Sequence, residues 1–182
     1  MIGTKGLIVQ DVKLPSTIVY GSDFAFDKEA TGFLGGDITY QYRLEGNESW
    51  EDTKPVKPGK YQVRAVSKNA FGGNIYGKAV TFEIGRKDIT FIINQDLIPY
   101  GDYENIEYKI YDGTPADKDY GSVGLVGSDS IENIDFIFDD TSKNTTYCHV
   151  DPDTIKILNS DNNDVSELYN VHVSDKEITF KT

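Results

Sequence analysis

The chain has 182 residues, of which 38% are hydrophobic, with 12 Tyr and 9 Phe, and this is enough apolar surface to exclude wholesale disorder. No stretch approaches the ~20 apolar residues that cross a bilayer, and a formal net charge of −12 repels phosphates and anionic lipids, which excludes nucleic-acid binding and membrane insertion. The single cysteine, Cys148, excludes an internal disulfide.

Apolar residues recur at every second position in many short segments, and this is the period of a half-buried β-strand. In chain order, the predicted strands cover residues 38–44, 61–65, 80–84, 89–93, 106–110, 134–138, 169–173 and 178–180. β-Branched and aromatic residues fill these segments, and Gly, Pro, Asn and Asp separate them as turn signals. No amphipathic helix of a dozen residues is predicted, so the chain is predicted to be all-β.

Three short segments of the first half recur in the same order in the second half. Ile18-Val19-Tyr20-Gly21 returns 80 residues later as Ile98-Pro99-Tyr100-Gly101. The segment at 58–63 has a weaker echo at 144–150, and Val80-Thr81-Phe82 is answered by Ile178-Thr179-Phe180. Recurrence of this kind indicates tandem modules. With short strands at regular spacing, it predicts two tandem immunoglobulin-like β-sandwich domains, residues 1–86 and 87–182, joined by a polar connector at 85–88.

The charge is divided unevenly between these two predicted domains. Residues 1–86 hold 11 basic and 10 acidic residues, a net charge of +1, whereas residues 87–182 hold 7 and 20, a net charge of −13. The change in charge falls at the predicted boundary. The second domain is therefore predicted to be strongly acidic.

A tyrosine follows a glycine turn at the start of one predicted strand. Gly59 lets the chain turn, and we expect Tyr61 to fold its ring under that corner and to send its hydroxyl to backbone upstream. Tyr147 is expected to do the same in the second domain, with Asn144 where the glycine would be, because Asn also tolerates positive φ.

Both predicted domains resemble known repeats. Residues 36–66, with Asp37-Ile38-Thr39-Tyr40, Trp50, Pro55 and the 58–63 segment, resemble the bacterial Ig-like repeats of large surface proteins. Residues 89–180 resemble the MBG/YDG-type repeat of bacterial adhesins, through Tyr100-Gly101 and the segments 124–129, 144–150, 169–171 and 178–180. This chain departs from that pattern at Asn144 and in the acidic loop 159–167.

The resemblance implies an exported bacterial protein, extracellular at the cell surface or secreted, in which such repeats act as spacers or adhesive units. It implies no catalytic residues and no cofactor. The first residues, 1–6, lack the apolar region of a signal peptide. Partners implied are other repeats of the same parent protein, or a host glycan or protein, and the chain is expected to be a monomer.

Candidate catalytic residues are few. Cys148 and His149 are adjacent in a predicted strand, so their side chains should point to opposite faces. We expect Cys148 to be a buried small hydrophobe and His149 to point outward, with no thiol chemistry. His172 lies between two valines and is expected to face solvent. No catalytic, cofactor or metal site is predicted.

Two further kinds of site have candidate residues, a Ca²⁺ site and an isopeptide crosslink. The loop 161–167, with Asp151 and Asp153 nearby, offers oxygen ligands for Ca²⁺, but Val165 breaks the EF-hand order and a solvated hairpin tip explains the same residues. A Lys–Asn isopeptide crosslink would need a buried Lys. Pairs of Lys13 or Lys87 with Asn74 or Asn170 are the candidates, and no spacing singles one out.

The alternative function from another class is a carbohydrate-binding module for host or cell-wall glycans. Sugars stack on exposed aromatic rings, and periodicity does not bury four aromatic residues, Trp50, Tyr103, Tyr111 and Tyr120. Single exposed aromatics are common on protein surfaces. The spacer function is therefore the primary prediction.

Overall fold

Alternating apolar and polar side chains form β-strands because successive residues of an extended chain face opposite sides of a sheet. The computed structural model describes residues 7–33, 36–116 and 124–181. Over this range no α-helix is present, and a 3₁₀ turn, η2, spans Ser166–Leu168. The prediction of an all-β chain is confirmed, and the several sheets are consistent with the β-sandwich class. In the same range no helix has the length and apolar character to cross a membrane.

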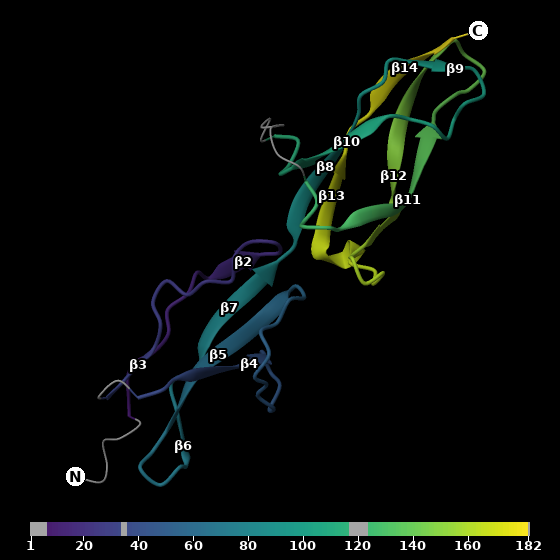
Figure 1. Cartoon of the computed structure of the whole chain (residues 1–182). Helices are drawn as coiled ribbons and strands as arrows, with labels where there is room; N and C mark the ends of the chain where they lie inside the picture. The colour runs from purple at the N-terminus through teal and green to yellow at the C-terminus, as the bar shows by residue number, and fades with distance from the viewer. Residues whose placement is uncertain (1–6, 34–35, 117–123, 182) are drawn as a thin grey trace. The chain divides into compact units, whose positions relative to one another are not determined.

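The chain divides into two compact units, Met1–Gly85 and Arg86–Thr182. In the first unit, four strands form a sheet in the order β2-β7-β5-β4, and β6 pairs with β5 (Figure 1). A two-stranded sheet, β1-β3, accompanies it. The strands are β1 Ile8–Gln10, β2 Thr17–Val19, β3 Thr31–Gly32, β4 Thr39–Leu44, β5 Gly59–Lys68, β6 Asn74–Tyr76 and β7 Val80–Gly85. All pairs are antiparallel except β2 with β7.

The core of the first unit lies on one face of β4, β5 and β7. Val63 and Phe82 are at most 1% exposed, and Tyr42 is 4% exposed. The ring of Phe24 packs edge-on against Tyr42 and Phe82, with centroids 5.8 and 5.5 Å apart, a favoured aromatic geometry. The alternation read from the sequence thus selects the inward face correctly.

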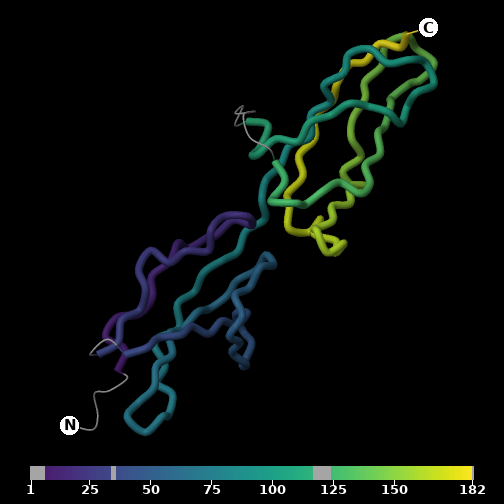
Figure 2. The backbone as a smooth tube through the Cα atoms, in the orientation of Figure 1, coloured from purple at the N-terminus to yellow at the C-terminus, as the bar shows by residue number. Residues whose placement is uncertain are grey.

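The second unit contains two sheets, ordered β10-β8-β13 and β11-β12-β14-β9, whose path Figure 2 traces. The strands are β8 Lys87–Ile93, β9 Leu97–Pro99, β10 Tyr108–Asp112, β11 Ser130–Phe138, β12 Thr145–Leu158, β13 Tyr169–Val173 and β14 Lys176–Lys181. The pairs β13–β8 and β14–β9 are parallel, and the others are antiparallel.

Strand β8 differs from its prediction. The segment 89–93 was expected to be half-buried, but Ile89, Thr90 and Phe91 are each at most 1% exposed. Successive residues of a strand face opposite sides of the sheet, so the burial of Ile89, Thr90 and Phe91 shows that both faces of β8 are covered. The hydroxyl of Thr90 donates a 2.7 Å hydrogen bond to the Gly113 carbonyl. A buried hydroxyl needs such a partner.

Two segments that carry the adhesin resemblance meet in the second unit. The buried Tyr169 donates its hydroxyl to the Asp129 carboxylate at 2.6 Å and accepts the Val126 amide at 2.9 Å. A side chain at Gly124 would meet the backbone of Tyr111 at 2.8 Å, so a residue without Cβ suits this position. These contacts fix the 124–129 segment against the sheet.

The first sequence echo is also an echo in structure. In both units a short strand pairs in parallel with the last strand, β2 with β7 and β9 with β14. The next residue then donates its amide to that last strand, Tyr20 to Gly85 at 2.9 Å and Tyr100 to Lys181 at 2.9 Å. Gly21 and Gly101 follow with φ of 84° and 91°, values that favour glycine.

The two corner tyrosines behave differently. Tyr61 stacks on Phe82, and its hydroxyl donates to the Lys57 carbonyl at 2.8 Å, as predicted. Tyr147 is 50% exposed, so the prediction for it is wrong. In β12 the neighbours Thr146 and Cys148 are buried, and alternation therefore turns Tyr147 outward.

The predicted connector is too long. Gly85 is the last residue of β7 and Lys87 is the first residue of β8, which leaves Arg86 alone between the strands. Lys87 and Asp88 pair with Tyr169 and Asn170 of β13. Lys87 and Asp88 are therefore part of a sheet, and only their polar side chains suggested a loop.

Candidate functional site

The thiol of Cys148 is sealed in the core. Cys148 is 0% exposed, and burial raises the pKa of its thiol to about 12, because a low-dielectric interior disfavours the thiolate. His149 points to the other face, where its Nδ1 lies 3.7 Å from the Asp175 carboxylate and 4.0 Å from that of Asp139. The expected divergence of the pair is confirmed, and a protonated thiol is a poor nucleophile.

His172 does not simply face solvent, as the sequence predicted. Its side chain is 34% exposed, and its Nε2 lies 2.9 Å from the Asp88 carboxylate. The parallel pairing of β13 with β8 places the two residues side by side. Alternation in the sequence predicts which face of a strand a residue occupies, but it does not predict which strand lies beside it. Asp88 could therefore not be predicted as the partner of His172.

The acidic loop closes on itself through Asn159. Its side-chain oxygen accepts the amides of Asp161 and Asn163 at 2.9 and 3.0 Å. Asp164 accepts the amide and hydroxyl of Ser166 at 2.9 and 2.7 Å, and these bonds lower the pKa of its carboxyl. Across residues 7–33, 36–116 and 124–181, no three His, Cys, Asp or Glu side chains group to hold a metal ion. The loop is thus organised by turn chemistry.

The same loop geometry exists in the first unit. Asn69 accepts the amides of Phe71 and Gly73, each at 2.9 Å. At the corresponding positions, Gly72 and Asn162 both have positive φ, 81° and 62°. The hairpins 69–73 and 159–163 are therefore equivalent at an offset of 90 residues, which sequence comparison missed because only the first residue is identical.

The lysines and asparagines considered for a crosslink do not meet. Lys13, Asn74 and Asn170 are exposed, whereas the crosslink was expected to need a buried lysine. Lys87 is paired with Asp112, its Nζ lying 2.7 Å from the carboxylate. The geometry favours a salt bridge for this lysine.

Trp50 stacks on arginines. The guanidinium carbons of Arg43 and Arg64 lie 4.3 and 4.2 Å from its ring centroid, and Arg64 also lies 3.8 Å from the Tyr76 ring. Arg43 and Arg64 bond Gln62 and Gln41 across β4 and β5. Desolvation lowers the pKa of Arg64. We define the Trp–Arg cluster as Gln41, Arg43, Trp50, Gln62, Arg64 and Tyr76. Its two arginines contact the Trp50 ring, which is a candidate for sugar stacking.

Tyr103 belongs to an aromatic cluster of the second unit. Its ring lies 5.3 Å from Phe138, 5.6 Å from Phe180 and 6.3 Å from Tyr100. Tyr100 is 60% exposed. Of the other two aromatics considered for sugar stacking, Tyr111 lies in β10 and is part-exposed, and Tyr120 lies outside the described residues.

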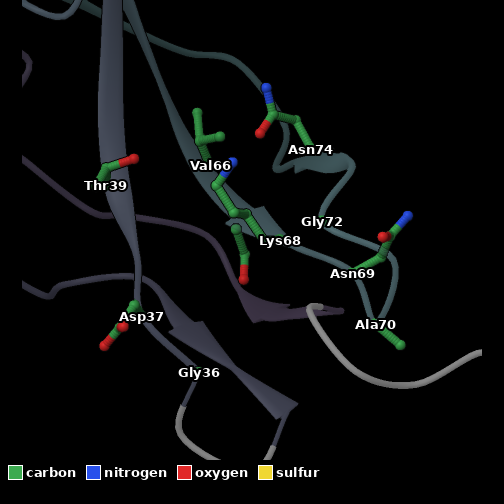
Figure 3. Close-up of a pocket in the computed structure, with 10 residues that line it drawn as sticks. Gly36, Asp37, Thr39, Val66, Lys68, Asn69, Ala70, Gly72 and Asn74 are labelled. Carbon is green, nitrogen blue, oxygen red and sulfur yellow. The ribbon is translucent and has the colours of Figure 1, made fainter.

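A depression of about 500 Å³ lies beside the β5–β6 hairpin in the first unit. It is lined by the starts and ends of strands and by the loop, including Asp37, Thr39, Lys68, Asn69 and Asn74 (Figure 3). Figure 3 shows the side chains of Asp37 and Asn69 directed away from each other. Since the Asn69 oxygen already accepts two amides, this depression holds no converging set of ligand groups.

No protein-family model matches the chain, and no curated protein matches it significantly. Among solved structures it is similar to a chain of the CbhA fibronectin(III)-like modules of Clostridium thermocellum. The sequence identity is 13%, the TM-score is 0.27, and the alignment covers 93% of this chain and 90% of the other. A similarity this low carries no argument about function.

Proposed function

We propose that this chain is a pair of tandem immunoglobulin-like modules, residues 1–86 and 87–182, that spaces or displays other parts of an exported bacterial surface protein without catalysis. The observation that carries the proposal is the duplication. Two consecutive units repeat three features: a short parallel edge strand, a hydrogen bond donated by the backbone amide of Tyr20 or Tyr100, and a hairpin closed by an asparagine side chain. This repetition supports a spacer, because each unit of a tandem array contacts only its neighbours along the chain.

Two features support a passive role. The residues with reactive side chains have structural roles. The Cys148 thiol is buried and protonated, and His172 is hydrogen-bonded to Asp88. The acidic loop uses Asn159 and Asp164 to close its own turns. The MBG/YDG-type assignment and the extracellular location remain part of this proposal, drawn from the sequence resemblance.

A spacer should hold its ends apart in solution. One residue, Arg86, lies between strands β7 and β8, and a connector this short restricts free swinging. Small-angle X-ray scattering of the full chain is therefore expected to give a radius of gyration well above the ~16 Å of a compact 182-residue globule. It is also expected to give the mass of a monomer, 20.3 kDa.

The matched control inserts six Gly-Ser residues after Arg86, which should broaden the distribution of distances without changing either unit. A compact radius of gyration near ~16 Å for the native chain would contradict the spacer function. So would an insertion variant with the same distance distribution as the native chain, because the connector would then impose no restriction.

A further inference from the structure

The second unit has a pocket that the spacer function does not explain. Its volume is about 640 Å³, within the ~300–1,000 Å³ of small-ligand pockets. The residues lining it are Tyr103, Glu104, Ile134, Asp135 and Phe136. The lining residues are therefore two aromatic, one aliphatic and two acidic, and the pocket lies where the 100–107 loop meets the edge strand β11.

The ring of Tyr103 is held in place before any ligand arrives. Phe138, Phe180 and Tyr100 surround it, with ring centroids 5.3, 5.6 and 6.3 Å away. A rigid aromatic ring at a pocket loses little conformational entropy on binding. It offers an apolar surface on which the C–H face of a sugar ring can stack.

The two carboxylates are free to accept hydrogen bonds. Within the described part of the chain, neither Glu104 nor Asp135 is in an ion pair, and no hydrogen bond to either carboxylate oxygen is present in that part. Carboxylates accept hydrogen bonds from hydroxyl groups strongly. The same two charges repel an anionic ligand, as does the net charge of −13 over residues 87–182.

From an aromatic wall beside two unpaired acceptors, we infer that the Tyr103 pocket binds an uncharged pyranose ring of a glycan. The ring stacks on Tyr103, and its hydroxyls donate to Glu104 and Asp135. In the first unit, the Trp50 ring contacts two guanidinium groups, which leaves it less suited to stacking. This inference goes beyond the spacer function and does not depend on it.

The test is NMR titration of the ¹⁵N-labelled full chain with hexasaccharides of β-1,4-glucose, β-1,4-xylose and β-1,4-N-acetylglucosamine, and with hexagalacturonate as the anionic probe. At least one neutral hexasaccharide is expected to bind with a Kd between ~10 μM and ~1 mM, shifting resonances of residues 101–107 and 133–137. Hexagalacturonate is expected to leave them unchanged.

Variants separate the pocket from the rest of the surface. Glu104→Ala and Asp135→Ala should each weaken binding about tenfold or more, because each removes a charge-assisted hydrogen bond to a sugar hydroxyl. Tyr103→Leu should abolish binding in a chain whose other resonances are unchanged. Glu177→Ala, which removes an exposed carboxylate of β14, is the matched control and should bind normally.

Three results would overturn the inference. The first is no shift with any of the neutral probes at 10 mM. The second is binding that maps to residues 7–85 or that prefers hexagalacturonate. The third is binding that survives Glu104→Ala and Asp135→Ala together. Each of them leaves the scattering test of the spacer function unaffected.

Discussion

At the scale of single residues, the aromatic side chains separate by what they contact. Tyr61 of β5 and Phe82 of β7 stack in the core of the first unit, whereas Trp50 lies beside Arg43 of β4 and Arg64 of β5. Periodicity correctly left Trp50 out of the core. Periodicity could not predict the contact between Trp50 and the two arginines, because that contact depends on the path of the 45–55 loop.

The Trp–Arg cluster should stabilise the first unit. Arg64→Met keeps the aliphatic stem and removes the charge that contacts Trp50 and Tyr76. Since partly desolvated cation–π pairs contribute about 0.5–2 kcal/mol, we expect the free energy of unfolding to fall by about 1–2 kcal/mol. Urea unfolding followed by the fluorescence of Trp50, the single tryptophan, measures it.

Lys60→Met on the same strand is the control, because Lys60 is exposed and away from the rings. Exposed substitutions of this kind change stability by about 0.5 kcal/mol or less. Equal losses for Arg64→Met and Lys60→Met would show that the cluster contributes nothing specific.

Cys148 should make the second unit sensitive to alkali. Burial raises the pKa of its thiol from 9.0 to about 12 in the folded chain. The thiol therefore stays protonated when folded but ionises on unfolding above pH 9. Its contribution to the free energy of unfolding is complete below pH 9 and is lost as the pH rises toward 12.

Urea unfolding of the native chain and of Cys148→Ala, between pH 8 and 11, measures this effect. The native chain should lose up to about 1.4 kcal/mol more per pH unit than the variant does over that range. Ionising tyrosines such as Tyr42 contribute to both slopes and cancel in the difference. Parallel pH profiles would show that the thiol ionises equally well when folded.

At the scale of elements, the strands with clear alternation were predictable and the short ones were not. Strands β4, β5, β7, β11 and β14 contain their predicted segments or nearly all of them. Strands β2 and β9 have three residues each, too few for a period to show. Strands β2 and β9 form because β7 and β14 supply parallel hydrogen-bonding partners. Which strands pair depends on the whole fold.

The asparagine-closed hairpins make an element-scale prediction. Asn159→Ala removes the oxygen that accepts two loop amides, and exposed hydrogen bonds of this type contribute about 0.5–1.5 kcal/mol each. We expect the second unit to lose about 1 kcal/mol, and Asn69→Ala should cost the first unit a similar amount. Hydrogen exchange of the flanking strands, β12 and β5, resolves the two effects.

Ser160→Ala is the matched control, since Ser160 is exposed in the same loop. It should leave exchange rates in β12 unchanged. If Asn159→Ala behaves like Ser160→Ala, the side-chain oxygen is not what closes this loop.

At the scale of the whole molecule, the sequence was sufficient for the class but not for the site. The all-β class follows from alternation, and the repeated segment at Tyr20 and Tyr100 marks an equivalent position in the two units without predicting its hydrogen bonds. The pocket could not be predicted, because Tyr103 meets Asp135 only when a loop and an edge strand come together. The exposed Tyr147 is a different case, since alternation with the buried Cys148 already turns it outward and the corner motif was wrongly carried over from Tyr61.

Two independent modules require separate cores. Ile178 and Val150 are fully buried in the second unit, and Val63 is fully buried in the first. Each unit should therefore fold without the other, even though Arg86 alone separates β7 from β8.

The most direct test records ¹H–¹⁵N correlation spectra of residues 1–86, of residues 87–182 and of the full chain. Both fragments are expected to give dispersed spectra that superpose on the full-chain spectrum, except for residues near Arg86. A fragment with collapsed dispersion, or with shifts spread through its core strands, would contradict this expectation, because that core would then need the other half of the chain.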